Sequence, residues 1–244
     1  MRIEESLRRG LGCGQDKIFV IGFNKNAGTT IAHLCMKNLL EAHHQPNWGF
    51  SAGLGKYQRG NFWNKFKCFS DGGNKEDFKF LSAHYPDSLF ILNCRPIKDW
   101  LFSRFKHGFS EHSKGQETPL WPCTSDTLAA WIKANQKHHI NVVKYFSRKP
   151  EQLIITDISQ PDWLPFLCEF SGLDFYDLHS NKRSSTVLSE NDIKEFNTSL
   201  LEACDLLGIT VNDLEASLFL ESSLNTNLSK SLQLIKNNLT FMIK

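Results

Sequence analysis

Short apolar runs alternate along the chain with longer stretches in which apolar residues recur three and four positions apart. The runs are bounded by polar or turn residues, as buried strands are, and they lie at residues 18–21, 89–92 and 152–157. Helical spacing predicts helices at residues 29–40, 77–82, 127–146 and 163–172. Because strands and helices alternate, we expect an α/β fold with a central, mainly parallel sheet flanked by helices.

The first strand leads into a glycine-bearing turn, residues 22–30, which reads Gly-Phe-Asn-Lys-Asn-Ala-Gly-Thr-Thr. Thr29 and Thr30 lie in the first turn of the helix that follows. The apolar face of that helix is predicted to contain Ile31, Leu34, Cys35, Leu39 and Leu40. A strand, a small-residue loop and a helix start bring several backbone N–H groups and the positive end of the helix dipole to one point. We expect that point to bind an anion such as a phosphate.

The turn differs from the P-loop of ATPases and GTPases, in which four residues separate the two glycines and a lysine directly follows the second. Here five residues separate Gly22 from Gly28, and Thr29 follows. Lys25 lies inside the turn instead. Its ammonium group would therefore approach the outer end of a bound phosphate chain from the loop itself.

Residues 24–30 resemble the 5′-phosphosulfate loop of the sulfotransferases, which has the form Pro/Asn-Lys-x-(Ala)-Gly-Thr-Thr/Ser after a buried strand. The resemblance implies a P-loop-like phosphosulfate-binding βα turn and the cofactor 3′-phosphoadenosine 5′-phosphosulfate. The residues that it assigns to the cofactor are Lys25, Asn26, Ala27, Gly28, Thr29 and Thr30. Lys25 is also a catalytic candidate, because its charge would stabilise the bridging oxygen as that oxygen leaves.

A second motif follows the apolar run at residues 89–92. In the sulfotransferases, an arginine at the end of a strand and a serine on the next helix hold the 3′-phosphate, and Arg95 and Ser103 have the family's separation of eight residues. The carboxyl end of a parallel strand is where α/β sheets bind ligands, and a planar guanidinium suits a phosphate. A surface ion pair between Arg95 and Asp99 is the alternative.

Later segments extend the resemblance over residues 17–201. Positions similar to a passage of bacterial-type sulfotransferases are His139, Val143, Tyr145, Phe146, Asp157, Trp163, Phe170 and Leu173. The family also has a late Asn-Lys segment near the nucleotide, so Lys182 and Arg183 are candidate cofactor ligands, with a solvated turn as the alternative. Residues 202–244 are predicted to be helical and carry no motif.

Sulfuryl transfer requires a group that takes the proton of the acceptor hydroxyl or amine. The Lys-Thr-His segment that supplies a histidine in animal cytosolic sulfotransferases is absent from this sequence. Asp71 occupies a position where bacterial relatives often have Phe-x-Asp, and His107, one helical turn beyond Ser103, is the second candidate. Asp71 could equally turn the chain through an Asx-type hydrogen bond. His84 and His139 are expected to be structural.

The chain has 244 residues, of which 41% are hydrophobic, so we expect one α/β domain at residues 17–244 after a flexible leader at residues 1–16. A formal net charge of +2 does not indicate a nucleic-acid partner. The seven cysteines contain no C-x-x-C pair, and we expect neither a disulfide framework nor a bound metal. No signal peptide or apolar run of ~20 residues is present, which predicts a cytoplasmic protein without a membrane span.

These features together predict a sulfotransferase that moves a sulfuryl group to a hydroxyl or amine of a small-molecule or glycan acceptor. Aromatic residues that could line the acceptor pocket, or belong to the core, are Trp48, Phe50, Trp63 and Trp121. Two alternatives remain open. One is a nucleotide-kinase-type phosphotransferase, for which Asp157 could serve as the metal-binding aspartate, and the other is a nucleotide-binding module without catalysis.

Overall fold

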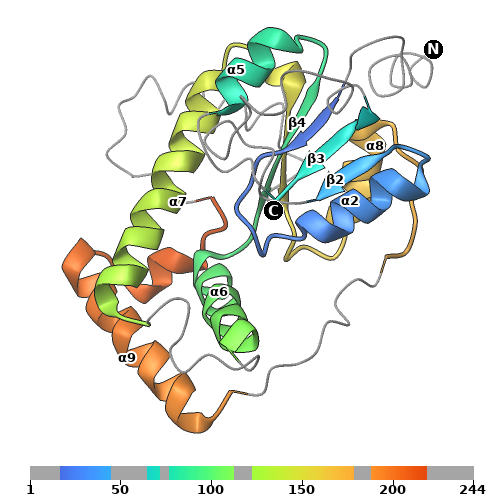
Figure 1. The fold of residues 1–244 in the computed structure, drawn as a ribbon. Helices are drawn as coiled ribbons and strands as arrows, with labels where there is room; N and C mark the ends of the chain where they lie inside the picture. The colour runs from blue at the N-terminus through green and yellow to red at the C-terminus, as the bar shows by residue number, and fades with distance from the viewer. Residues whose placement is uncertain (1–16, 45–64, 72–76, 113–122, 179–187, 219–244) are drawn as a thin grey trace. The chain divides into compact units, whose positions relative to one another are not determined.

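The computed structural model describes residues 17–44, 65–71, 77–112, 123–178 and 188–218, and Figure 1 shows their helices and strands. Contacts within the chain gather in two compact units. The described residues of the first unit are 17–44, 65–71, 77–94 and 140–178, and those of the second are 95–112, 123–139 and 188–218. The predicted leader lies outside the described residues, and the single-domain organisation stays a prediction.

The first unit is built on a five-stranded sheet in which every strand is parallel to its neighbours (Figure 1). The strands, in order across the sheet, are β2 (Ala42–His44), β3 (Cys68–Ser70), β1 (Ile18–Val20), β4 (Leu89–Cys94) and β5 (Leu153–Asp157). β1 therefore lies at the centre, between β3 and β4. This sheet confirms the predicted α/β fold.

Helices cover both faces of the sheet in this unit. They are α2 (Gly28–Lys37), α5 (Asp77–His84), α8 (Trp163–Ser171) and the last residues of α7 (Ser125–Phe146). α2 and α8 share one face, where Asn38 exchanges two hydrogen bonds with the backbone of Asp174. On the other face, the ring of Phe146 packs against Phe78 of α5 and Phe90 of β4, with centroid distances of 5.9 and 4.9 Å.

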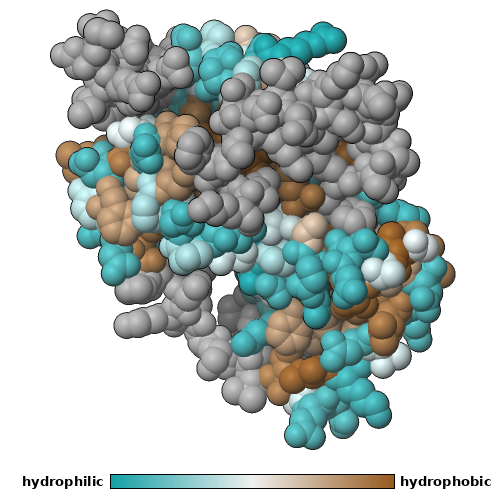
Figure 2. Space-filling model, turned by 180° about the vertical axis from the view of Figure 1, so that it is seen from behind, coloured by the Kyte–Doolittle hydropathy of each residue, from teal (hydrophilic) through white to brown (hydrophobic). Residues whose placement is uncertain are grey.

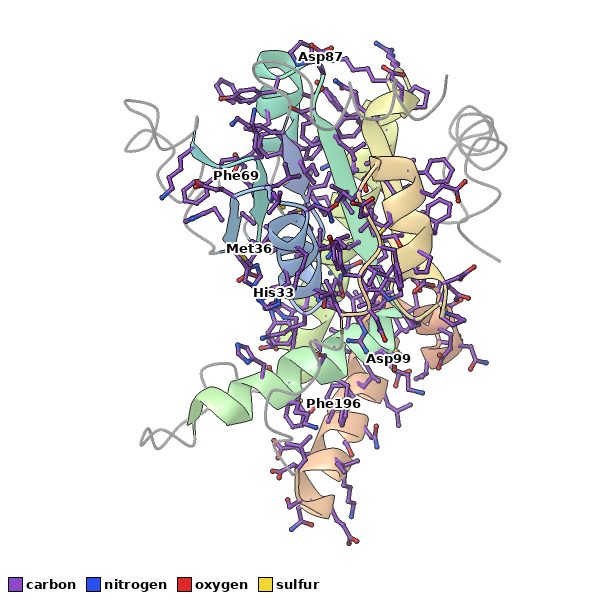
Figure 3. All side chains as sticks on the ribbon, turned by 90° about the vertical axis from the view of Figure 1, so that its right-hand side faces the viewer. His33, Met36, Phe69, Asp87, Asp99 and Phe196 are labelled. Carbon is purple, nitrogen blue, oxygen red and sulfur yellow. The ribbon has the colours of Figure 1, made fainter. Side chains whose placement is uncertain are left out.

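The centre of this unit is an aromatic layer on the three middle strands. Phe19 of β1 stacks on Phe69 of β3 and Phe90 of β4, with ring centroids 5.5 and 5.2 Å apart, and all three rings are fully buried. Figure 3 shows Phe69 in the sheet, whereas His33 and Met36 lie on the exposed side of α2. Strands buried on both faces read as continuous apolar runs, which is why β1 and β4 are visible in the sequence.

The sequence prediction misses β2 and β3. Each has three residues, as β1 has, but Ala-His-His and Cys-Phe-Ser contain no continuous apolar run, so neither shows a strand pattern. Both strands depend on backbone pairing instead. β3 pairs with β1 on one side, where Ile18 lies opposite Cys68, and with β2 on the other, where His44 lies opposite Ser70.

The predicted first helix is too long, and Leu39 is not part of its buried face. α2 ends at Lys37, and Leu39 has a positive φ of 60° and is 94% exposed. Leu40 turns back into the core, where its N–H donates to the Cys35 carbonyl at 2.9 Å. The boundaries of α5, α7 and α8 agree closely with prediction, and α8 ends as expected at Gly172, whose φ is 69°. The predicted start of the C-terminal helices at residue 202 is wrong, because a helix already covers Glu190–Leu207.

The second unit is helical. Its elements are α6 (Ile97–His112), the first part of α7, α9 (Glu190–Leu207) and η4 (Val211–Glu215), a 3₁₀ helix. Phe196 of α9, which Figure 3 labels, packs between Phe102 and Phe105 of α6 at centroid distances of 5.2 Å. The Arg104 guanidinium lies 4.2 Å from the ring centroid of Trp131 on α7. Burial lowers the pKa of the Arg104 guanidinium to about 10.

On the face of the molecule that Figure 2 shows, hydrophilic and hydrophobic described residues, in teal and brown, are mixed. Exposed large apolar residues include Phe170 and Phe175 in the first unit and Leu201 and Leu206 in the second. Within the described part of the chain, no helix combines the length and apolar character that crossing a bilayer requires.

Candidate functional site

The turn between β1 and α2 leaves the carboxyl end of the central strand. In parallel sheets this edge binds ligands, particularly where neighbouring strands connect to helices on opposite faces. β1 leads to α2 on one face, and its neighbour β3 precedes α5 on the other. The predicted phosphosulfate loop therefore lies at such a point within the first unit.

The backbone of this turn is held in an uncommon conformation. Lys25 and Ala27 have φ angles of 67° and 61°, in the left-handed region that side chains with a Cβ rarely adopt. Ala27 is the N-cap of α2, and its methyl group cannot accept a hydrogen bond from the first helical turn. That turn, which begins with Gly28, also contains no acidic residue. The helix start thus has N–H donors and a positive dipole end, and its own first turn carries no carboxylate.

Asn93 of β4 fixes the turn from the neighbouring strand. Its Oδ1 accepts from the Gly22 N–H at 3.1 Å, and its Nδ2 donates to the Asn26 carbonyl. The Asn26 side chain returns a hydrogen bond from Nδ2 to the Asn93 carbonyl at 3.1 Å. Asn93 and Asn26 are each only 1% exposed, so these bonds join two ends of the turn to β4 in a buried setting. These bonds help to hold Lys25 and Ala27 in their left-handed backbone conformation.

The close approach of Asn93 also explains why residue 22 is a glycine. A Cβ on residue 22 would lie 2.2 Å from Asn93 Oδ1 and 2.3 Å from the Asn93 carbonyl oxygen, which is closer than atoms can pack. The sequence prediction includes Gly22 in the motif but misses Asn93. An asparagine inside an otherwise apolar run was the available signal, because a polar residue in a buried strand needs partners.

A hydrogen-bonded chain of side chains lies beside the start of α2. Thr29 Oγ1 is 2.8 Å from His44 Nε2, and His44 Nδ1 is 2.6 Å from Ser70 Oγ. The Ser70 hydroxyl in turn donates to the Gly28 carbonyl at 3.2 Å. His44 and Ser70 are missed by the sequence prediction, because they end two strands that it does not contain.

Asp71 is brought to the same place. It follows β3 directly, is half-buried and has a φ of 72°. Its backbone nitrogen lies 3.9 Å from the position that a Cβ on Gly28 would occupy, and that position is 3.5 Å from His44 Cε1. The left-handed backbone agrees with a role in turning the chain, since aspartate and asparagine tolerate this region better than most residues. Its location beside α2 agrees equally with a role in chemistry.

The other predicted site residues belong to the second unit or to segments outside the described residues. Arg95 is the first residue after β4 and is half-buried. Ser103 and His107 are half-buried and one turn apart on α6. Lys182 and Arg183 are not among the described residues. The aromatic candidates that also lie outside them are Trp48, Phe50, Trp63 and Trp121.

Two other groups have strongly perturbed pKa values. Burial lowers the pKa of His139 to about 3, helped by the neighbouring His138, so His139 is neutral at physiological pH. This agrees with the structural role predicted for it. Lys17 precedes β1 at the opposite edge of the sheet, and burial together with the charge of Lys67 lowers its pKa to about 8.

The donors of the turn suit an anion rather than a metal. Backbone N–H groups of α2, the hydroxyls of Thr29 and Thr30 and the ammonium of Lys25 all offer hydrogens or positive charge. Across the described ranges, no three histidine, cysteine or acidic side chains gather closely enough to hold a metal ion. No protein-family model matches this chain, and no curated protein matches it either.

Proposed function

We propose that this protein is a sulfotransferase that moves a sulfuryl group from 3′-phosphoadenosine 5′-phosphosulfate to a hydroxyl or amine of an acceptor, with a glycan hydroxyl as the favoured class. The observation that carries the proposal is the β1–α2 turn. Two left-handed residues, Lys25 and Ala27, and the buried Asn93 bonds hold the helix start at the carboxyl edge of the central strand. The same turn carries the sulfotransferase-like motif.

The residues of the turn fit the 5′ end of the nucleotide. The first N–H groups of α2 and the Thr29 and Thr30 hydroxyls would bind its non-bridging oxygens. The Lys25 ammonium would stabilise the negative charge that develops on the bridging oxygen, a contribution that grows as the reaction proceeds. The nucleotide itself supplies the activated sulfuryl group and is left as adenosine 3′,5′-bisphosphate.

The roles of Arg95 and Ser103 rest on their spacing and on the family resemblance. A half-buried guanidinium can make a charge-assisted bidentate contact with a phosphate, and a serine hydroxyl adds one donor. We assign both to the 3′-phosphate. Lys182 and Arg183 are further candidate ligands on the same grounds.

Asp71 is the favoured general base because it follows β3 beside the helix start, within reach of the region where an acceptor must meet the sulfuryl group. His107 on α6 is the second candidate.

The phosphotransferase alternative is weakened by the contacts of Asp157. Its Oδ1 accepts from the Ser159 N–H at 2.9 Å and from the Ser159 hydroxyl at 2.6 Å, and its Oδ2 lies 3.4 Å from Gln160 Nε2. These bonds close a turn after β5 and occupy the carboxylate that a bound magnesium ion would need.

The test is calorimetric binding of adenosine 3′,5′-bisphosphate, AMP and ATP to the full chain. We expect the bisphosphate to bind far better than AMP, because AMP lacks the 3′-phosphate. Arg95→Ala should weaken bisphosphate binding by about 1.5 to 3 kcal/mol and leave AMP binding unchanged. Arg148→Ala, at an exposed site, is the matched control and should bind like wild type. Equal affinities for the bisphosphate and AMP, or a preference for ATP with magnesium, would contradict the proposal.

A further inference from the structure

The side chains beside the start of α2 form one continuous hydrogen-bonded chain, from Thr29 through His44 and Ser70 to the Gly28 carbonyl. Every member belongs to the first unit, and the chain joins α2, β2 and β3. His44 is its central member, because both of its ring nitrogens are engaged. A histidine with both nitrogens committed has a defined tautomer.

The Ser70 hydroxyl has one hydrogen and two contacts, so its direction sets that tautomer. When it donates this hydrogen to the Gly28 carbonyl at 3.2 Å, it acts as an acceptor towards His44, and Nδ1 carries the hydrogen. In a neutral imidazole the other nitrogen, Nε2, is then an acceptor. The hydroxyl of Thr29, 2.8 Å away, therefore donates its own hydrogen to Nε2.

This direction matters for an anion at the start of α2, because an anion needs donors. While His44 is neutral, the hydroxyl hydrogen of Thr29 is directed to the imidazole. A protonated imidazole donates from Nε2 to Thr29 Oγ1 instead, which releases that hydrogen for the anion and adds a positive charge nearby.

We propose that His44 is a positioning residue that couples anion binding at the start of α2 to the uptake of one proton, acting through the Thr29 hydroxyl. The inference rests on the proposed function, which places the 5′ end of the nucleotide at this helix start. Thr29 would contact the ligand, and His44 would act on the ligand through Thr29.

The elements packed around His44 carry other titratable groups, which would affect the size of the coupling. These groups are Lys25 in the turn, His33 on α2, Glu41 and His43 at β2, and Asp71 after β3. Asp71 and Glu41 favour the charged imidazole, and Lys25 opposes it. His43 alternates to the other side of β2, where its ring lies 5.1 Å from the ring of Phe66.

The experiment is calorimetric titration of the full chain with adenosine 3′,5′-bisphosphate between about pH 6 and about pH 8, the interval in which histidine titrates. Buffers of different ionisation enthalpy give the number of protons taken up. The phosphates of the ligand also titrate, but they do so for every variant, so differences between proteins isolate the contribution of His44. Both proteins should bind the bisphosphate more weakly as the pH rises. The loss of affinity should be about tenfold larger in wild type than in His44→Gln.

Three further variants separate coupling from mere support of the fold. Thr29→Val keeps the shape of the side chain without the hydroxyl and should lose the pH-dependent difference although His44 is intact. Thr29→Ser keeps the hydroxyl and should retain the difference. His43→Gln, on the neighbouring residue of β2, is the matched control and should behave like wild type.

Nitrogen NMR of the histidine rings adds a readout that does not depend on affinity. The ring signals of His44 are those that wild type has and His44→Gln lacks. At neutral pH and without ligand, these signals should show hydrogen on Nδ1 alone. After the bisphosphate is added, both nitrogens should be protonated. A spectrum with hydrogen on Nε2 alone, or a ring that stays neutral when ligand binds, would overturn the inference.

The outcomes distinguish this inference from the proposed function. If wild type binds no adenosine 3′,5′-bisphosphate at any pH, both fail. If it binds tightly, and His44→Gln and Thr29→Val show the same pH dependence as wild type, the function stands and the coupling is wrong. Should His44→Gln fail to fold, the pH dependence of Thr29→Val compared with Thr29→Ser and wild type still decides the question.

Discussion

The two ends of β1 carry two lysines with opposite surroundings. At the amino end, Lys17 is 4% exposed, its Nζ donates to the Phe66 carbonyl at 2.9 Å, and the rings of Phe69 and Tyr85 lie 5.5 Å away. At the carboxyl end, Lys25 is half-buried in a turn with a left-handed backbone. Burial lowers the pKa of Lys17, whereas Lys25 lies in the turn where we propose that the nucleotide binds.

The difference follows from the direction of a parallel sheet. All five strands end at the same edge, so the turn after β1, the end of β3 and the end of β2 meet there. The opposite edge receives the strand starts, and around Lys17 it is closed by packing and by the bond from the Lys17 N–H to Ser88 Oγ at 3.0 Å. A perturbed pKa therefore marks burial at one end, whereas the left-handed backbone and the helix start mark the proposed binding site at the other.

Replacing Gly22 tests whether the carboxyl end is as tightly held as described. Gly22→Ala places a Cβ 2.2 Å from Asn93 Oδ1, so we expect it to lower the free energy of unfolding by about 3 kcal/mol or more, measured by urea denaturation. Gly28→Ala is the matched control, since its Cβ would be 3.5 Å from the nearest atom and should change stability little. A Gly22→Ala protein as stable as wild type would show that Asn93 does not clamp the turn.

Replacing Lys25 tests the chemical role of this end. Lys25→Ala keeps a Cβ and hence the same backbone strain, and it should reduce turnover by about a hundredfold to a thousandfold while weakening nucleotide binding much less. Turnover is measured as release of adenosine 3′,5′-bisphosphate with an acceptor found by screening glycans and phenols. Lys37→Ala, in the last turn of α2 and exposed, should leave turnover unchanged. Turnover within a few-fold of wild type in Lys25→Ala would exclude the proposed role.

Replacing Asp71 separates its two possible roles at the carboxyl edge. Asp71→Asn tolerates the φ of 72° and preserves the turn, but it removes the base, so we expect turnover to fall by about a hundredfold with unchanged stability. Near-normal turnover would make Asp71 a turn residue, and His107→Ala would then be the next variant to assay.

Replacing Lys17 tests the amino end, where we expect an effect on stability alone. Because the pKa of Lys17 is about 8 when folded and 10.5 ordinarily, folded protein releases this proton first as the pH rises. The penalty of burying the charge is present below about pH 8 and is relieved between about pH 8 and about pH 10. Over that interval wild type should gain on the order of 2 kcal/mol of stability relative to Lys17→Met.

The matched control for that measurement is Lys133→Met, at an exposed position of α7, which should show no such gain. Parallel stability curves for wild type and Lys17→Met would show that the buried lysine keeps its charge at no cost. A loss of nucleotide binding in Lys17→Met, without a loss of stability, would contradict the distinction between the two ends of β1.

The sequence by itself determined β1, β4, β5, α5, α7 and α8 and the sulfotransferase-like motif of the turn, but not α9, most of which precedes the residues predicted to be helical. β1, β4 and β5 are visible as apolar runs because they are buried on both faces, and α8 ends at Gly172 because glycine adopts the left-handed cap without a Cβ penalty. These features can be predicted because each depends on residues that are close together in the sequence.

Only the tertiary structure decided which side chains surround the turn. Asn93, His44 and Ser70 reach it from three different strands, at sequence separations of 71, 15 and 42 residues from Gly22, Thr29 and Gly28. β2 and β3 are too short to leave a periodic pattern, and their pairing is fixed by backbone hydrogen bonds to neighbours that lie far away along the chain. A hydrogen bond between distant residues leaves no mark in the spacing of either residue, so the fold must bring them together before their chemistry can be recognised.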